Sequence, residues 1–447
     1  MECYTLKIEI AFQQWIQYIE SDFGSIDNFL TIDSEFTEWL PHAQDVHLIG
    51  DFNSWDRRKL ALFKDQYGKW KLNLSKGILK QGQAYKLEIL NSKGHWKDRN
   101  QAYAKYMRQE PEGQFNCIYY ESHYKWRHTK NTKPDMQPLR IYEAHIGIAS
   151  HEPRVGTYTE FKDDILPRIK SMGYNAIQLM AIPEHAYYGS FGYQITNLFA
   201  TSSRFGTPDE FKDLCDTAHG LGLKVILDIC LSHTSTNADD GIGDMDGTDS
   251  QYFYDGPRSY HTVWDCKIYD LTKTEVVRYL INALRYYIDE YRVDGFRLDA
   301  ITSMLFKHHG KCKDFRAESD YYNDDLDIES CAFLKLAIHS IKSLHPDTIF
   351  IAEDASGFPG LGLSQSDGGF GFDYVHGMNC ADIVCYVLEE FNRHHKMNIA
   401  DQLVRSLTSR KRGEKYIAYA ECHDQCFHGG QTVIQKILQG KSMYYLI

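Results

Sequence analysis

The feature that most constrains the fold is a regular alternation of short apolar segments and helical segments after residue 138. Seven segments are typical of strands, at 139–147, 176–180, 224–228, 295–299, 349–353, 371–375 and 416–420. Helical periodicity lies between them at 159–172, 208–220, 274–291 and 330–344. Strands that alternate with helices predict an α/β fold with a parallel sheet, and seven in succession favour a (β/α)8-type barrel over an open sheet. Functional side chains are then expected at the carboxyl ends of the strands.

A different pattern precedes this barrel. Short strands separated by turn residues are predicted at 35–41, 45–52, 69–75, 83–91 and 115–120. They indicate a small β-sandwich over residues 36–122. Residues 1–35 are predicted to be an N-terminal helical segment, because an irregular apolar stripe over 5–30 favours one or two short amphipathic helices. The polar stretch 123–138 is the expected linker, and the barrel takes residues 139–447.

The charge balance argues against a polyanionic partner. With 49 Lys and Arg against 61 Asp and Glu, the formal net charge is -12, so neither nucleic acid nor an anionic membrane is expected to bind. Aromatic residues make up 14% of the chain, which suits stacking on sugar rings. The 11 cysteines have no regular spacing, and we find no secretory signal and no membrane-spanning segment, so a cytoplasmic location is expected.

Polar residues gather where the predicted strands end. They are Asp228 and His233 after the third strand, Asp299 after the fourth, Glu353 after the fifth, and His423 and Asp424 after the seventh. Taken singly, such residues could cap a helix or form an ion pair. Because a barrel brings all these ends to one face, their joint occurrence favours a functional site.

Arg297 and Asp299 interrupt the apolar fourth strand. Side chains two positions apart point to the same face of a strand, so this guanidinium and this carboxylate are expected to lie side by side. A structural ion pair is one reading. The other is a carboxylate that the arginine keeps ionised and nucleophilic.

Several carboxylates and histidines in one barrel mouth, without a cofactor motif, match the needs of retaining glycoside chemistry. One carboxylate attacks the anomeric carbon and a second, about 5 Å away, protonates the leaving oxygen. A third can stabilise the cationic transition state. No cofactor is expected.

Longer stretches carry a family resemblance: "RIYEAHIGIASHEPRVGTY", "DGTDSQYFYDGPRSYHTVWD", "YRVDGFRLDAITSMLFKHHG", "IAEDASGFPGL" and "YAECHDQ". They resemble the alpha-amylase family of glycoside hydrolases and transferases, and within it the eukaryotic type of glycogen branching enzymes. The likeness extends over nearly all of the chain after residue 37, where "TEWLPHAQDVHLIGDFNSWDRR" resembles an N-terminal glucan-binding sandwich.

The resemblance implies roles at the matching positions. Asp299 resembles the nucleophile, Glu353 the general acid/base, Asp424 the transition-state stabiliser and Arg297 the arginine that orients the nucleophile. The resemblance also implies sugar-binding residues, which are Tyr193, Asp228, His233 and His423 in the barrel and Trp55 and Lys69 in the sandwich.

The implied reaction cleaves an α-1,4-glucosidic bond and transfers the oligoglucan to a 6-hydroxyl with retained configuration. The implied partner is glycogen or another α-1,4-glucan polymer, bound by a monomer. Two alternatives stay open: an amylase-like hydrolase, and an inactive glucan-binding remnant. The second arises because relatives in the family continue beyond a seventh strand, so the barrel is expected to lack its last strand and helix and to expose two edges.

The segment "ECHDQCFH" concentrates Cys422, His423, Cys426 and His428. Its spacing fits no usual zinc pattern, so no metal site is expected there.

Overall fold

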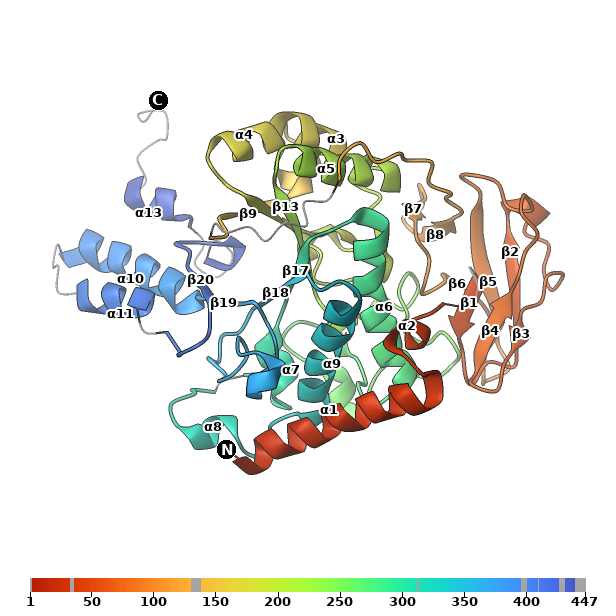
Figure 1. Cartoon of the computed structure of the whole chain (residues 1–447). Helices are drawn as coiled ribbons and strands as arrows, with labels where there is room; N and C mark the ends of the chain where they lie inside the picture. Colours follow the sequence, from red (N-terminus) through yellow and green to blue (C-terminus); the bar gives the residue numbers. More distant parts are fainter. Residues whose placement is uncertain are drawn as a thin grey trace.

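The structure is a computed structural model that describes residues 2–32, 36–129, 138–311, 313–394, 400–408, 410–425 and 431–438. Residues 130–137, half of the predicted linker at 123–138, therefore lie outside the described residues. Figure 1 shows the N-terminal sandwich on one side of the barrel and helices α10 (Met378–His394), α11 (Ala400–Thr408) and α13 (Val433–Leu438) on the other. No helix in the described part of the chain is both long and apolar enough to cross a bilayer.

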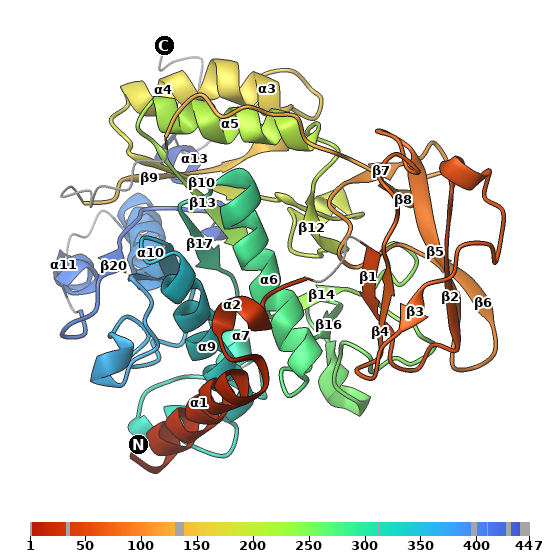
Figure 2. The ribbon, with the colours of Figure 1, turned by 45° about the vertical axis from the view of Figure 1, so that its right-hand side comes forward.

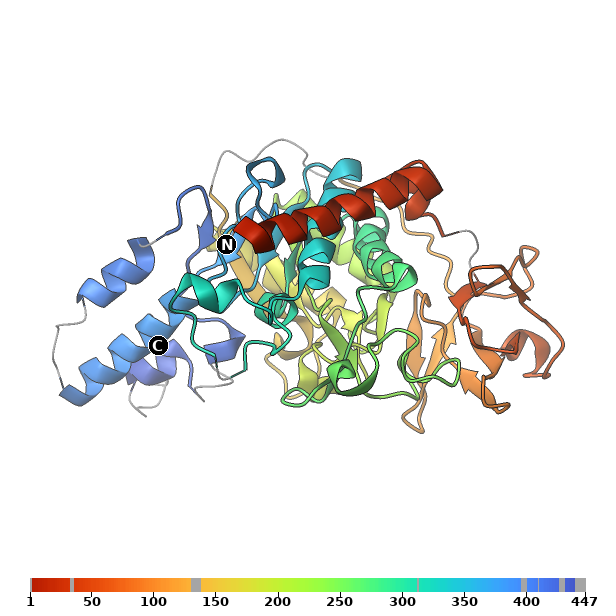
Figure 3. The ribbon, with the colours of Figure 1, turned by 90° about the horizontal axis from the view of Figure 1, so that it is seen from below.

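The N-terminal segment forms one long helix, α1 (Glu2–Phe23), and one short helix, α2 (Ile26–Phe29). The prediction of one or two short helices was wrong about the length of the first, because α1 extends for 22 residues along the helix α9 (Ile328–Leu344). Ile8, Phe12 and Ile19 are its buried residues. Figures 2 and 3 show α1 lying against the outside of the barrel.

The sandwich consists of two antiparallel sheets. One holds β1 (Phe36–Trp39), β3 (Phe63–Lys64) and β4 (Lys69–Leu72). The other holds β2 (Asp45–Gly50), β5 (Ala84–Leu90), β6 (Trp96–Arg99), β7 (Met107–Gln109) and β8 (Phe115–Ile118). Each of the five predicted segments contains a strand. The strands β3, β6 and β7 were not predicted, because they are short and have few apolar residues.

The sandwich docks onto the barrel through buried polar contacts. The Glu38 carboxylate accepts hydrogen bonds from Ala102 N at 2.7 Å and from the Tyr252 hydroxyl at 3.1 Å. The Trp39 and Tyr252 rings meet edge to face. Burial raises the pKa of Glu38 to about 7. The two units therefore share one continuous core.

The part of the chain after residue 138 forms a seven-stranded, all-parallel sheet, as the alternation predicted. Its order is β20-β19-β18-β17-β13-β10-β9. The strands are β9 (Ile141–His145), β10 (Ala176–Met180), β13 (Lys224–Ile229), β17 (Gly295–Leu298), β18 (Ile349–Ala352), β19 (Tyr374–His376) and β20 (Tyr416–Ile417). Within the described residues β9 and β20 are the two edges, and no eighth strand joins them.

Helices pack on the outside of this sheet. Those between the strands include α3 (Tyr158–Glu160), a π-helical turn (Phe161–Ile165), α4 (Leu166–Ser171), α5 (Pro208–Gly220), α6 (Thr274–Tyr291), α7 (Ile301–Leu305) and α8 (Glu318–Tyr321). Smaller strands lie in the loops: β11 (Pro183–Glu184), β12 (Asn197–Thr201), β14 (His233–Ser235), β15 (Tyr260–His261) and β16 (Cys266–Ile268). Helix α5 begins at the predicted residue because Thr207 and Glu210 form a capping box before Pro208.

Candidate active site

The candidate site lies where β13, β17 and β18 end side by side. In the register of these parallel strands Asp228 pairs with Arg297, and Leu298 pairs with Ala352. Asp299 and Glu353 immediately follow β17 and β18, and Glu353 N donates a hydrogen bond to Leu298 O at 3.1 Å. Both carboxyl groups therefore lie side by side at the carboxyl edge of the sheet.

Close approach of β17 to β18 depends on Gly295. A Cβ atom at this position would lie 2.3 Å from the carbonyl oxygen of Ile349 on β18, which is closer than atoms can approach. The absence of a side chain at Gly295 thus permits the strand pairing that sets Asp299 beside Glu353.

Arg297 is the electrostatic centre of the site, and its side chain is 2% exposed. Its Nη1 atom lies 2.6 Å from Asp299 Oδ1 and 2.9 Å from Asp228 Oδ1. Burial opposes the charge of this guanidinium, but the facing carboxylates of Asp228 and Asp299 outweigh it and hold the pKa of Arg297 well above its usual range. The pairing predicted from the strand alternation is confirmed, and it includes Asp228 as a third member.

Glu353 has a different environment. Its Oε2 atom accepts a hydrogen bond from Ala300 N at 2.7 Å, and Ala300 adopts a left-handed conformation with φ 58°. Burial is the main cause that raises the pKa of Glu353 to about 7, and the charges of Asp299 and Asp424 add to it while Arg297 opposes it. Glu353 can therefore hold a proton near neutral pH.

Burial likewise raises the pKa of Asp228 to about 6, with Arg297 opposing the shift. Asp228 also accepts a hydrogen bond from the Tyr193 hydroxyl at 2.9 Å. Tyr193 follows Gly192, whose φ of +90° and close approach to Ala181 leave no room for a side chain. This turn places the Tyr193 ring at the carboxyl ends of the strands.

The Tyr193 ring stacks on His423, with centroids 5.5 Å apart and planes 25° apart. His423 Nε2 lies 3.3 Å from Asp424 Oδ1, so the loop after β20 brings both predicted residues into the site. His233 lies in β14 near the same strand ends and is 3% exposed. The structure thus assembles all eight barrel residues that the sequence singled out.

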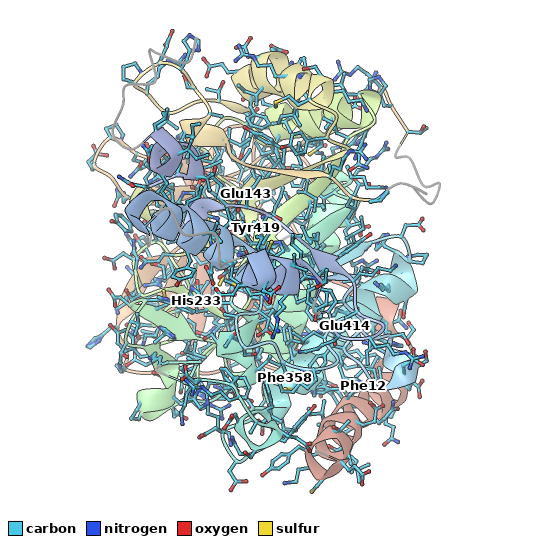
Figure 4. The ribbon with its side chains drawn as sticks, turned by 90° about the vertical axis from the view of Figure 1, so that its left-hand side faces the viewer. Phe12, Glu143, His233, Phe358, Glu414 and Tyr419 are labelled. Carbon is cyan, nitrogen blue, oxygen red and sulfur yellow. The ribbon has the colours of Figure 1, made fainter. Side chains whose placement is uncertain are left out.

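Glu143 on β9 was missed by the sequence analysis. Its carboxylate accepts hydrogen bonds from His423 N at 3.1 Å and pairs with His423 Nδ1 at 2.7 Å. Burial lowers the pKa of His423, but the hydrogen bond and charge of Glu143 outweigh it and raise that pKa to about 9. Figure 4 shows Glu143 beside Tyr419 near the middle of this face, with His233 below them. The sequence feature that could have revealed Glu143 is a carboxylate inside the apolar segment 139–147.

The two sandwich residues lie apart from this cluster. Trp55 donates a hydrogen bond from Nε1 to Asp51 at 2.9 Å and is half-buried. Lys69 pairs with Glu275 of α6 at 3.0 Å, and its side chain is only 12% exposed. Lys69 therefore joins the sandwich to the barrel, and this placement does not favour the predicted glucan contact.

A metal ion has one candidate position among the described residues. Ligand atoms of Glu143, Cys422 and His423 lie within 4.8 Å of one another. Cys426 and His428, which complete the cysteine and histidine cluster in the sequence, lie outside the described residues.

The site holds an ion-paired carboxylate (Asp299), a carboxyl group poised to carry a proton (Glu353) and a third carboxylate (Asp424). This set can perform nucleophilic attack and general acid–base catalysis on a glycosidic bond. Two family models match the chain: carbohydrate-binding module 48 (isoamylase N-terminal domain) over residues 30–104, and the alpha amylase catalytic domain over residues 163–264.

Several relatives are similar over nearly the whole chain. The 1,4-alpha-glucan-branching enzyme of Yarrowia lipolytica is 42% identical over 94% of this chain and 62% of that protein. The enzyme of the same name from Equus caballus is 42% identical over 94% of this chain and 63% of that protein. The one from Solanum tuberosum is 40% identical over 98% of this chain and 52% of that protein. The chain thus spans about half to two thirds of the length of these curated relatives.

A solved structure supports the fold. The catalytic module of the glycogen-degrading pneumococcal virulence factor SpuA superposes with a TM-score of 0.63 at 17% identity, covering 88% of this chain and 62% of that one. The family models, the sequence relatives and the curled parallel sheet agree. The chain is therefore similar, over nearly its whole length, to the 1,4-alpha-glucan-branching enzymes, and it carries a match to the alpha amylase catalytic domain.

Proposed function

We propose that this chain catalyses glucan branching: it cleaves an α-1,4-glucosidic bond and transfers the oligoglucan to a 6-hydroxyl of glycogen or a similar α-1,4-glucan. The observation that carries the proposal is the contrast between two neighbouring carboxyl groups. Asp299 is ion-paired with Arg297 at 2.6 Å, whereas burial raises the pKa of Glu353 to about 7. Retaining glycoside chemistry requires this division between a nucleophile and an acid/base.

In the first step Asp299 attacks the anomeric carbon, and a covalent bond to the carboxylate oxygen forms as the glycosidic bond breaks. Glu353 donates its proton to the departing 4-oxygen. In the second step Glu353 takes the proton of an incoming 6-hydroxyl, whose oxygen displaces Asp299. Two inversions at the anomeric carbon retain the α configuration. Asp424 stabilises the positive charge that develops at the ring in both steps.

Residues around this pair hold the sugar at the cleavage point in the proposed mechanism. Tyr193 supplies the stacking ring, and Asp228, His233 and His423 bind hydroxyl groups. The Glu143 contact to His423 supports a donor role for that imidazole, since it keeps the ring protonated near neutral pH. In the sandwich Trp55 remains a proposed glucan contact, whereas Lys69 is assigned to the interface with α6.

We also infer that the functional units are the sandwich at 36–122 and the barrel at 139–447, acting as a monomer in the cytoplasm on a neutral polymer. The net charge of -12 and the free thiols of buried cysteines such as Cys117 and Cys215 support this setting.

The test is proton NMR of amylose incubated with the purified full chain, following the α-1,6 anomeric signal together with reducing ends. Growth of the α-1,6 signal without matching growth of reducing ends is expected. Growth of reducing ends alone would replace the proposal with an amylase-like hydrolase. No change in a folded sample would leave a glucan-binding remnant. The matched control is Asp299→Asn, which keeps the size of the side chain and removes its charge.

A further inference from the structure

We infer that Trp264 forms a sugar-binding platform at the rim of the candidate site, for a glucose unit beyond the one bound at the cleavage point. The inference deepens the proposed function and rests on it. Trp264 lies in the turn between β15 and β16, which pair antiparallel with His261 opposite Cys266. The neighbouring strand β14 pairs with β16 and carries His233. One small sheet therefore holds both Trp264 and a residue of the candidate site.

Trp264 is supported from beneath by a buried ring. Its indole stacks on His261 with centroids 3.9 Å apart and planes 15° apart, and His261 is 1% exposed. The His233 ring lies 5.1 Å from the indole, tilted by 39°. The indole is nevertheless 39% exposed, which is unusual for a large aromatic side chain held so firmly. It therefore presents flat apolar surface next to His233.

The backbone of Trp264 is also held in place. Its N–H donates to His261 Nδ1 at 3.1 Å, and its carbonyl oxygen accepts from Gln194 Nε2 at 3.1 Å. Gln194 follows Tyr193, the proposed stacking residue of the cleavage subsite. The turn that carries Trp264 is therefore hydrogen-bonded to the segment that contains Tyr193. A rigid aromatic surface binds a ligand with little loss of conformational entropy, so this geometry favours binding over simple packing.

The ligand class follows from the chemistry of the surface. Val263, beside Trp264, is 68% exposed, so the rim offers apolar area next to the indole. The apolar face of a glucose ring matches such a surface, and its hydroxyl groups can remain in water. A glucan chain that occupies the subsite formed by Tyr193 and His233 can continue across Trp264.

The first experiment is local: hydroxyl-radical footprinting of the full chain with saturating maltoheptaose, read by mass spectrometry. The labelling of Trp264 is expected to fall severalfold, while the labelling of Tyr386, which lies on α10 outside the sandwich and is 47% exposed, provides the reference for radical dose. Unchanged labelling of Trp264 at saturation would overturn the inference.

The second experiment uses variants. Trp264→Ala is expected to raise the KM for amylose about tenfold with kcat within about twofold, and Trp264→Phe is expected to stay near the parent protein. Tyr386→Ala, on α10 outside the sandwich, is the matched control for loss of an exposed ring. Equal KM values for Trp264→Ala and the parent would reject the platform. If maltoheptaose protects Trp264 but no α-1,6 signal grows, branching fails and the sugar-binding platform stands.

Discussion

At the residue scale, the site works by giving chemically similar groups different surroundings. Asp228 and Asp299 share one guanidinium, which compensates for the burial of Asp228. Glu353 accepts a backbone N–H from Ala300, and burial raises its pKa to about 7. This contrast with the ion-paired Asp299 is the basis of the proposed roles of acid/base and nucleophile.

The protonation of Glu353 predicts the alkaline limb of the pH profile. Because its pKa is raised to about 7, the acid form needed for the first step is lost as pH rises through 7, so kcat/KM for amylose should fall about tenfold per unit above that value. Glu353→Gln should lower turnover by about 10²- to 10⁴-fold and remove this limb. If the alkaline limb of the Glu353→Gln variant stays at the same pH, the limb belongs to another titrating group.

The pairing of Glu143 with His423 predicts a shift in imidazole protonation. Glu143→Gln removes the charge that raises the pKa of His423 to about 9, so burial should then dominate and lower it. Diethyl pyrocarbonate modifies neutral imidazole, so His423 should react at lower pH in the variant, as read by mass spectrometry. Glu152→Gln, an exposed change of the same charge, is the control and should leave the reaction profile unchanged.

At the element scale, the contact between β17 and β18 positions the two carboxyl groups of the proposed reaction. Strand register brings Asp299 and Glu353 to the same level, and Gly295 allows the strands to approach. The left-handed Ala300 then turns the chain so that its N–H reaches Glu353. Catalytic geometry at this site thus depends on backbone positions as much as on the reacting side chains.

Gly295→Ala tests this dependence. The added methyl group would meet the Ile349 carbonyl, so β18 must move, with an expected loss of about 1–3 kcal/mol in stability and a larger fall in kcat than in substrate affinity. Gly243→Ala is the matched control, because a Cβ atom there meets only ordinary contacts. Thermal denaturation and amylose kinetics provide the two readouts. Equal melting temperatures for the two variants would contradict the assigned role of Gly295.

At the scale of the whole molecule, a sandwich, an N-terminal helix and an open parallel sheet share one core. The α1 helix is bound to α9 through its apolar face and through Glu9, which lies 2.9 Å from the buried Lys335 Nζ. The sandwich is joined by Lys69 and Glu38. In the parallel sheet, the middle strands each pair with two neighbouring strands, whereas β20 pairs only with β19 among the described strands.

Amide hydrogen exchange should show this difference between the central strands and the edge strand β20. Amides of β13 and β17, which lie between two neighbours, should exchange slowest, and those of β20 should exchange far sooner. Mass spectrometry of peptic peptides over a time course measures the rates. The amides of β8 in the sandwich serve as an internal reference, since β8 also lies between two strands. Protection of β20 equal to that of β17 would mean that another element covers this edge.

The sequence by itself determined the parallel sheet, because an alternation of strands and helices has few ways to bury its apolar faces. It also determined the neighbourhood of Arg297 and Asp299, since strand periodicity is local. Only the tertiary structure decided that Asp228 shares the same guanidinium, that Glu143 holds His423, and that Lys69 faces α6 instead of solvent. These contacts join residues far apart in the chain, so no local pattern encodes them. The length of α1 likewise followed from its packing on α9, which propensity alone does not predict.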